Sequence, residues 1–169
     1  MQEREEKGKA VAGDIEKAPS VVDGDREEAV IRSLLDTFPT GLTDFKRLSK
    51  GVLRAKIERR DLLKACRHLR DALSFEHITM ISAVEYDGRF EVVYHISSYR
   101  DRLLLELITT TPKEDPSVDS VSSVWGGADW QEREAYDLMG IKFNNHPRLE
   151  RILLPKDYLY HPLRKDFKG

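Results

Sequence analysis

Between residues 25 and 110, apolar positions recur with the periods of helices and strands. The stretch 25–38 places apolar residues every three or four positions, which predicts an amphipathic helix that ends before Pro39. The residues expected on its buried stripe are Ala29, Ile31, Leu34, Leu35 and Phe38.

The residues that follow predict a mixed α/β domain. Alternating apolar side chains indicate strands at 42–47 and 52–58, and a second helical stripe covers 62–73. Three further strands are expected at 77–85, 90–97 and 102–110, with an Asp-Gly turn between the first two. The order helix, strand, strand, helix, strand, strand, strand predicts an α/β (α+β) two-layer sandwich, with two helices on one face of a four- or five-stranded sheet.

The last quarter of the chain has a different pattern. A short helix is expected from Pro116 to about Trp125, and a longer one begins at Ala128 or Asp129 and ends at Gly140. Beyond that glycine the pattern supports an extended tail. We therefore expect a polar, disordered extension at 1–24, a two-layer domain at 25–127, and a helix with a tail at 128–169.

Composition excludes several classes of protein. Charged residues form 34% of the chain, but 28 Lys and Arg nearly balance 30 Asp and Glu, which argues against a nucleic-acid partner. The single cysteine, Cys66, cannot build a disulfide framework, an iron–sulfur cluster or a cysteine zinc site, and it is expected to be buried. No apolar run approaches 18 residues, so a direct membrane span is not expected.

The helix at 128–139 carries polar and aromatic side chains in nearly every direction, which suggests contacts on more than one side. Arg133 and Asp137 are four residues apart and are expected to pair. Glu132 and Glu134 point to different sides of the helix, which disfavours acid–base catalysis. His146 and His161 lack a third metal ligand at a defined spacing, so no metal site is expected.

The tail has the composition of a segment that lies on another protein. His146-Pro147 and His161-Pro162 favour extended backbone, and Ile152 to Leu154 supply apolar anchors. Its arginines and Lys165 offer charge-assisted hydrogen bonds to carboxylates of a partner.

These residues closely resemble a known family. The run Glu132-Arg133-Glu134-x-Tyr136-Asp137-Leu138-Met139-Gly140-Ile141-x-Phe143, then His146-Pro147, Arg151-Ile152-Leu153 and His161-Pro162-Leu163-Arg164-Lys165-Asp166-Phe167, resembles the thirty-kilodalton (C-type) peripheral-arm subunit of respiratory complex I and its counterparts in membrane-bound hydrogenases. The resemblance implies a two-layer α/β fold, no cofactor in this chain, and no catalytic residue. It also implies a hydrogenase-large-subunit-like partner, a cluster-bearing small subunit, and a place on the cytoplasmic side of the cell membrane.

Within this resemblance, an NADH or F420 dehydrogenase and a hydrogenase or sulfur-reducing relative remain open. Two other classes also remain: a stand-alone hydrolase using Glu132, Glu134 and His146, and a small-ligand binding module with a deep pocket. The residues predicted to contact partners are Trp130, Glu132, Arg133, Glu134, Tyr136, Asp137, Phe143, His146, Pro147, Arg151, Leu154, His161, Pro162, Arg164, Lys165 and Asp166.

Overall fold

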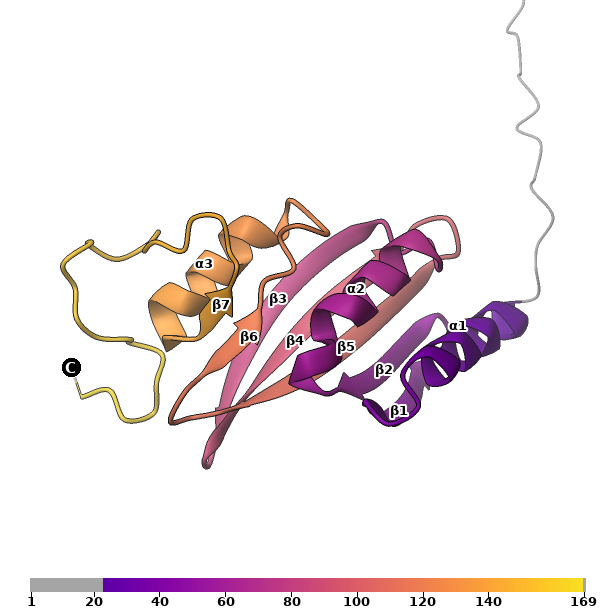
Figure 1. Ribbon diagram of the computed structural model, residues 1–169, viewed down its shortest axis with the longest axis horizontal. Coiled ribbons are helices and arrows are strands. Elements are labelled where there is room, and N and C mark those ends of the chain that lie inside the picture. The colour runs from indigo at the N-terminus through magenta and orange to yellow at the C-terminus, as the bar shows by residue number, and fades with distance from the viewer. Residues whose placement is uncertain (1–22, 169) are drawn as a thin grey trace, which may run out of the picture.

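The computed structural model describes residues 23–168 of the chain (Figure 1). None of the helices in this part of the chain is long and apolar enough to span a membrane. The elements are α1 Asp23–Thr37, β1 Leu42–Ser49, β2 Val52–Ile57, the 3-10 turn η1 Arg59–Asp61, α2 Leu62–Asp71, β3 His77–Tyr86, β4 Arg89–Ser98, β5 Leu103–Pro112, β6 Ser117–Asp119, α3 Ala128–Met139 and β7 Lys142–Asn144.

Strands β1 to β5 form one mixed sheet in the order β1-β2-β5-β4-β3. After β2 the chain crosses through α2 to the far edge of the sheet, and the antiparallel meander β3-β4-β5 then returns to pair with β2 in parallel. The predicted element order, the meander and the five-stranded sheet are confirmed.

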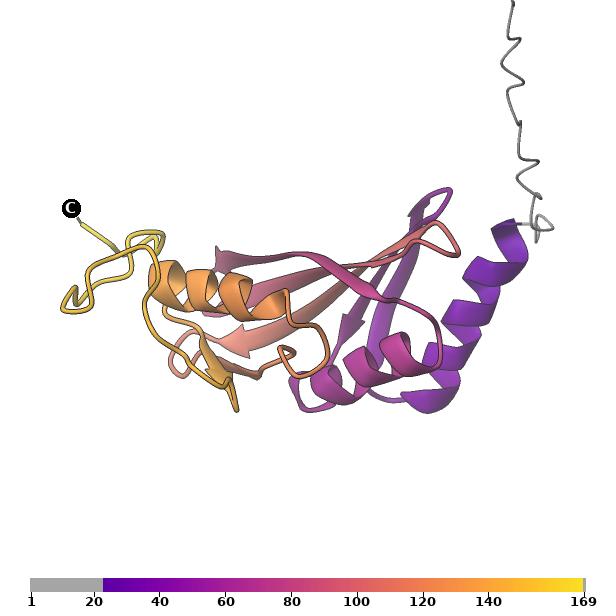
Figure 2. The same cartoon turned by 90° about the horizontal axis from the view of Figure 1, so that it is seen from above.

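Helices α2 and α3 lie on the same side of the sheet, and no helix of residues 23–168 covers the other side (Figure 2). Alternate residues of each strand point to the covered side, as the two-residue period of strands requires. On the uncovered side, charged residues pair across strands, as where Arg54 of β2 contacts Glu106 of β5 at 2.6 Å. The largest fully buried side chains of the covered side belong to Leu34, Leu53, Leu62, Leu69, Phe75, Phe90, Tyr94, Ile96, Leu105 and Leu107.

The buried stripe of α1 is rotated from the predicted one. Val30, Leu34 and Phe38 are buried, whereas Ala29 and Leu35 are exposed, so the prediction for these two residues was wrong. The helix also starts at Asp23, two residues earlier than expected. The disorder predicted for residues 1–22 lies outside the described residues.

The buried stripe of α1 begins with an acidic residue, Glu27, which explains why the stripe was predicted on the wrong face. Glu27 is 2% exposed and accepts hydrogen bonds from the backbone N–H of Gly51 at 2.8 Å and from Arg47 at 2.7 Å. Positions 27, 30, 34 and 38 share one face of the helix. A helical stripe predicted from hydrophobic residues alone does not include Glu27.

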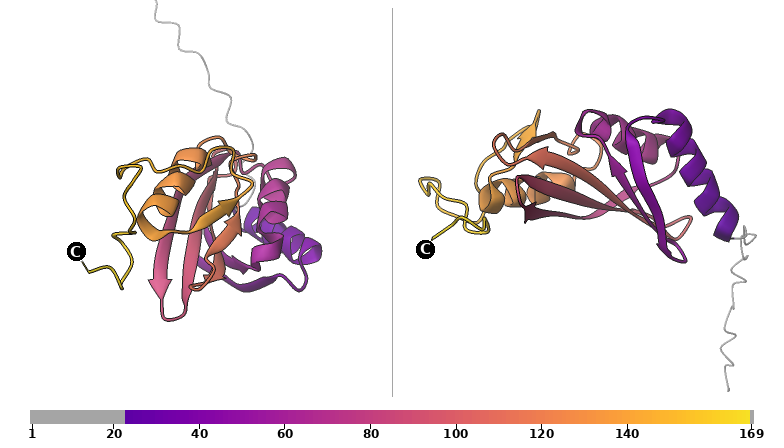
Figure 3. Two further views of the ribbon diagram at one scale, coloured as in Figure 1. Left: turned by 60° about the vertical axis from the view of Figure 1, so that its left-hand side comes forward. Right: turned by 90° about the horizontal axis from the view of Figure 1, so that it is seen from below.

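The helix predicted from Pro116 to Trp125 is not formed. Residues Ser117–Asp119 instead make β6, which pairs in parallel with β7 just after α3. The hydroxyl of Thr111 holds this turn, because it accepts from Ser117 N–H and donates to Ser117 C=O. Beyond β7 the tail runs along the outer side of α3, at the opposite end of the molecule from α1 (Figures 1 and 3).

Candidate partner-binding site in the docked tail

The carboxylate of Asp137 fastens the start of the tail to α3. One oxygen accepts from three successive backbone N–H groups, those of Ile152, Leu153 and Leu154, at 2.8 to 2.9 Å. The other oxygen lies 2.6 Å from the Arg151 guanidinium. Asp137 is fully buried, so all of these bonds are made away from water.

This arrangement stabilises the ionised form of Asp137. Burial by itself raises the pKa of a carboxyl, but the N–H groups of Leu154 and Leu153, the Arg151 side chain and the Ile152 N–H outweigh it and lower the pKa to about 2. The predicted pair of Arg133 and Asp137 is therefore replaced by Arg151 and Asp137. Arg133 instead donates to the carbonyl of Glu150 at 3.1 Å and stacks on Trp130.

The end of the tail caps the C-terminus of α3. The imidazole Nδ1 of His161 lies 2.9 Å from the Asp137 carbonyl, Leu163 N–H donates to Leu138 C=O at 3.1 Å, and Arg164 Nε donates to Met139 C=O at 2.7 Å. The last carbonyls of a helix have no partner within it, and a cation there is favoured by the helix dipole. The His-Pro-Leu-Arg segment therefore completes this helix.

Gly140 permits that close approach. Its φ is +72°, the left-handed conformation expected from the sequence. A Cβ at this position would lie 2.7 Å from both the His161 ring and the Arg164 guanidinium. Glycine is required here both by its backbone conformation and by the tail packed over it.

A second ionic anchor ties the tail to the sheet. Glu85 of β3 is 5% exposed, lies 2.5 Å from the Lys113 ammonium and accepts from Lys165 N–H at 2.7 Å. Burial opposes ionisation of Glu85, but the Lys113 and Lys165 hydrogen bonds prevail and lower its pKa. The Lys113 ammonium also lies 3.3 Å from the Asp166 carboxylate of the tail. Glu85 and Lys113 therefore both contact the tail.

A buried polar cluster joins α3, the β6 loop and the start of the tail. Glu132 is fully buried and accepts from Ser120 Oγ at 2.6 Å and Val121 N–H at 2.7 Å. Nε2 of the fully buried His146 ring lies 3.8 Å from Glu132 and 3.2 Å from the Asp129 carbonyl. Burial raises the pKa of Glu132 to about 7, although the Ser120 and Val121 hydrogen bonds oppose that rise.

These contacts correct the predicted roles of several residues. Side chains expected to touch a partner are instead buried within the chain, because each satisfies a polar group or fills the core of this chain: Glu132, Arg133, Asp137, Phe143 and His146. Three others turn their polar groups toward α3 and are partly buried: Arg151, His161 and Arg164. For the remaining residues, contact with a partner stays a prediction. They are exposed or half-buried: Trp130, Glu134, Tyr136, Pro147, Leu154, Pro162, Lys165 and Asp166.

Besides charged side chains, the tail exposes several large apolar ones, and most of these apolar residues were missed. Leu153, Leu159, Tyr160 and Leu163 are 60 to 82% exposed. We name these four residues the outward tail face. The signal in the sequence is the recurrence of leucine and tyrosine between prolines, of which only 152–154 were predicted to be anchors.

The structure offers little for a catalytic or metal site. Glu132 is buried and Glu134 is exposed, so they do not converge on a common point. Among the described residues, no group of three or more His, Cys, Asp and Glu side chains is arranged to hold a metal ion. Cys66 is fully buried, as predicted, and burial raises the pKa of its thiol.

Comparison with known proteins shows that the chain is similar to subunits of respiratory oxidoreductase complexes. The C subunit of NADH-quinone oxidoreductase from Geobacter sulfurreducens is 40% identical over 147 residues, covering 85% of this chain and 90% of that protein. The C subunit of F(420)H(2) dehydrogenase from Methanosarcina mazei is 39% identical over 143 residues, covering 83% and 90%.

The family pattern and the solved structures agree with this class. The pattern described as "Respiratory-chain NADH dehydrogenase, 30 Kd subunit" matches residues 55–169, and the chain belongs to that family. The trypsin-resistant fragment of Nqo5 is 27% identical with a TM-score of 0.62, covering 73% of this chain and 99% of the fragment. A chain of a membrane-bound sulfane sulfur reductase, an archaeal respiratory complex, has the same fold, with a TM-score of 0.74 at 21% identity over 85% and 86% of the two chains.

The predicted family and fold class are therefore confirmed. The chain is a C-type subunit of a complex-I-like oxidoreductase complex.

Proposed function

We propose that this chain carries no redox cofactor or catalytic residue and acts in its complex by holding neighbouring subunits in electron-transfer geometry. The neighbours are a large hydrogenase-like subunit and a cluster-bearing small subunit, on the cytoplasmic side of the membrane. Support comes from the family and from the lone buried thiol, which is unsuited to cluster ligation. The electrons and the translocated ions then pass through other subunits.

The observation that carries this proposal is the polarity of the tail. Soluble proteins normally bury apolar side chains and expose polar ones. The tail departs from this rule in part, since the polar groups of Arg151, His161 and Arg164 face its own helix, while the four large apolar side chains of the outward tail face are exposed among charged residues. Exposed apolar surface of this kind is typical of protein contact sites.

The test uses an affinity-tagged chain in its native complex. Leu153→Asp combined with Leu163→Asp places two carboxylates on the outward tail face and keeps the backbone N–H groups by which both residues are anchored. We expect the large soluble subunit to be lost from the purified complex while the melting temperature of the isolated chain stays within about 1 °C. Leu48→Asp on β1, a similar change at an exposed leucine far from the tail, is the matched control. Normal assembly of the double variant would contradict the proposal.

A further inference from the structure

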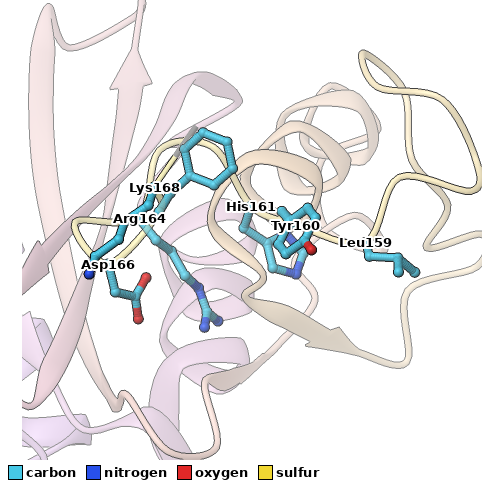
Figure 4. Close-up of a pocket in the computed structure, with 7 residues that line it drawn as sticks. Leu159, Tyr160, His161, Arg164, Asp166 and Lys168 are labelled. Carbon is cyan, nitrogen blue, oxygen red and sulfur yellow. The ribbon is translucent and has the colours of Figure 1, made fainter.

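The last residues of the tail line an open pocket of about 420 Å³ (Figure 4). These residues lie at the end of the molecule opposite α1 (Figure 1). The apolar walls of the pocket come from Leu159, Tyr160 and Phe167. The rings of Tyr160 and Phe167 are 6.2 Å apart and tilted by 55°, and Leu159 is the most exposed large apolar residue of the described chain. The pocket is wide enough to receive a leucine or aromatic side chain.

The pocket is fixed on both sides by contacts with the folded domain. His161 and Arg164 are bound to the last carbonyls of α3, and Lys165 N–H is bound to Glu85 of β3. The turn between them is closed by hydrogen bonds from Arg164 N–H to His161 C=O and from Phe167 N–H to Arg164 C=O, each 3.1 Å. A site that is ordered before binding loses less conformational entropy when a partner arrives.

The charges at the pocket are mainly positive. Arg164 and Lys168 line it, and no carboxylate of the described residues lies within 4.0 Å of either cation. The one acid of the lining, Asp166, is paired with Lys113 at 3.3 Å. An occupant that carries negative charge therefore complements the rim, and an apolar one complements the walls.

We propose that this pocket receives an apolar side chain, leucine or aromatic, from a segment of a neighbouring subunit that carries an Asp or Glu beside it. The inference rests on the proposed function, since it names the chemistry of the partner at one end of the outward tail face. The carboxylate pairs with Lys168 at the rim, and the apolar side chain packs against the exposed surfaces of Tyr160 and Phe167. Buried aromatic anchors within a charged rim are the usual energetic centres of such interfaces.

Photo-crosslinking in the native complex tests the assignment. With benzoylphenylalanine in place of Leu159, irradiation should join the chain to one subunit, at a peptide that has a leucine or aromatic residue within a few positions of an Asp or Glu. Crosslinks to lipid, or to a peptide without an acid, would overturn the proposal. Binding of the tagged chain to phosphatidylglycerol vesicles that is lost in Lys168→Glu would assign the pocket to a membrane surface and would equally overturn it.

Two substitutions separate this inference from the proposed function. Tyr160→Ala and Lys168→Glu should each reduce the co-purified partner about tenfold at moderate salt, the loss expected for one interface anchor. Lys168→Arg should retain it. If Leu153→Asp with Leu163→Asp abolishes assembly but these two variants assemble normally, the pocket assignment fails and the proposed function stands. If all of them assemble normally, both fail.

Discussion

The α/β domain and the docked tail keep their shapes by opposite means. In the domain, apolar side chains such as Leu53, Tyr94 and Leu105 are buried between sheet and helices. In the tail, polar groups point inward, and Asp137, Glu85 and the α3 carbonyls hold them. Four large apolar side chains of the tail, Leu153, Leu159, Tyr160 and Leu163, are left outside.

The difference shows where each region derives its stability. The domain buries enough apolar surface to fold by the hydrophobic effect. The tail has few buried apolar groups and relies on a small number of buried, charge-assisted hydrogen bonds, which are costly to lose one at a time. A single substitution should therefore release the tail and spare the domain.

The largest effect is expected from Asp137→Ala. It leaves Arg151 without its carboxylate and three N–H groups without an acceptor, so the free energy of unfolding should fall by about 3 kcal/mol. Trypsin should then cut after Lys156 at least about tenfold faster, while cleavage inside the domain stays slow. Glu134→Ala, at an exposed acid of the same helix, is the control. Equal trypsin resistance of the variant and the natural chain would contradict the role given to Asp137.

Glu132 should give the chain a measurable pH dependence. The folded pKa of about 7 is above the unfolded value of 4.5, so its contribution to stability is complete below pH 4.5 and is lost as pH rises through 7. This difference in pKa corresponds to a loss of about 3 kcal/mol in the free energy of unfolding between pH 4.5 and 8. Urea unfolding at the two pH values should show this loss in the natural chain and not in Glu132→Gln. An unchanged pH profile in Glu132→Gln would show that another group titrates.

Gly140→Ala should destabilise the junction of helix and tail. Alanine at a φ of +72° costs about 1 kcal/mol, and its Cβ meets His161 and Arg164. We expect a total loss of about 2 kcal/mol in denaturant unfolding, together with faster proteolysis of the tail. Gly88→Ala, with a similar φ of +70° but open space around it, separates the backbone cost from the contact with the tail. Equal losses in the two variants would show that the tail does not pack on Gly140.

Arg164→Ala should have the smallest effect. It removes one hydrogen bond to Met139 C=O and a cation at the C-terminus of α3, so a loss of about 1 kcal/mol is expected. The contact with Met139 adds a role within the chain to the predicted role of Arg164 at a partner, which stays a prediction. Lys168→Ala, which removes a cation without such a bond, should leave the melting temperature of the isolated chain unchanged. A melting temperature of Arg164→Ala equal to that of the natural chain would show that the cap adds nothing.

The sequence predicted those features that repeat along the chain. The strands from His77 to Pro112 have clear periods, the helix that ends at Gly140 has a clear stop signal, and these elements formed as expected. The strands β6 and β7 have three residues each, which is too short for a period, and the chain between them includes a whole helix. The pairing of β6 with β7 could therefore not be predicted from the local pattern of apolar and polar residues.

The tail shows a second limit of the sequence. Asp137 meets partners 14 to 17 residues further on, three of them backbone N–H groups that carry no signature of residue type. The composition of the tail correctly indicated an unusual segment, but it did not distinguish polar groups that bind the chain itself from those left for a partner. The charged residues of the motif were therefore assigned outward. Among the exposed apolar residues, Leu153 was predicted to be an anchor, whereas Leu159, Tyr160 and Leu163 were passed over.

Hydrogen exchange on the isolated full-length chain tests the docked tail most directly. The amides of Ile152, Leu153, Leu154, Leu163 and Lys165 are bound to Asp137, to Leu138 C=O and to Glu85. They should exchange at least about a hundredfold more slowly than an unstructured peptide, whereas the neighbouring amides of Lys156 and Asp157 should exchange freely. Exchange of all seven amides at the unstructured rate would show that the tail is not docked before assembly, and the account would fail.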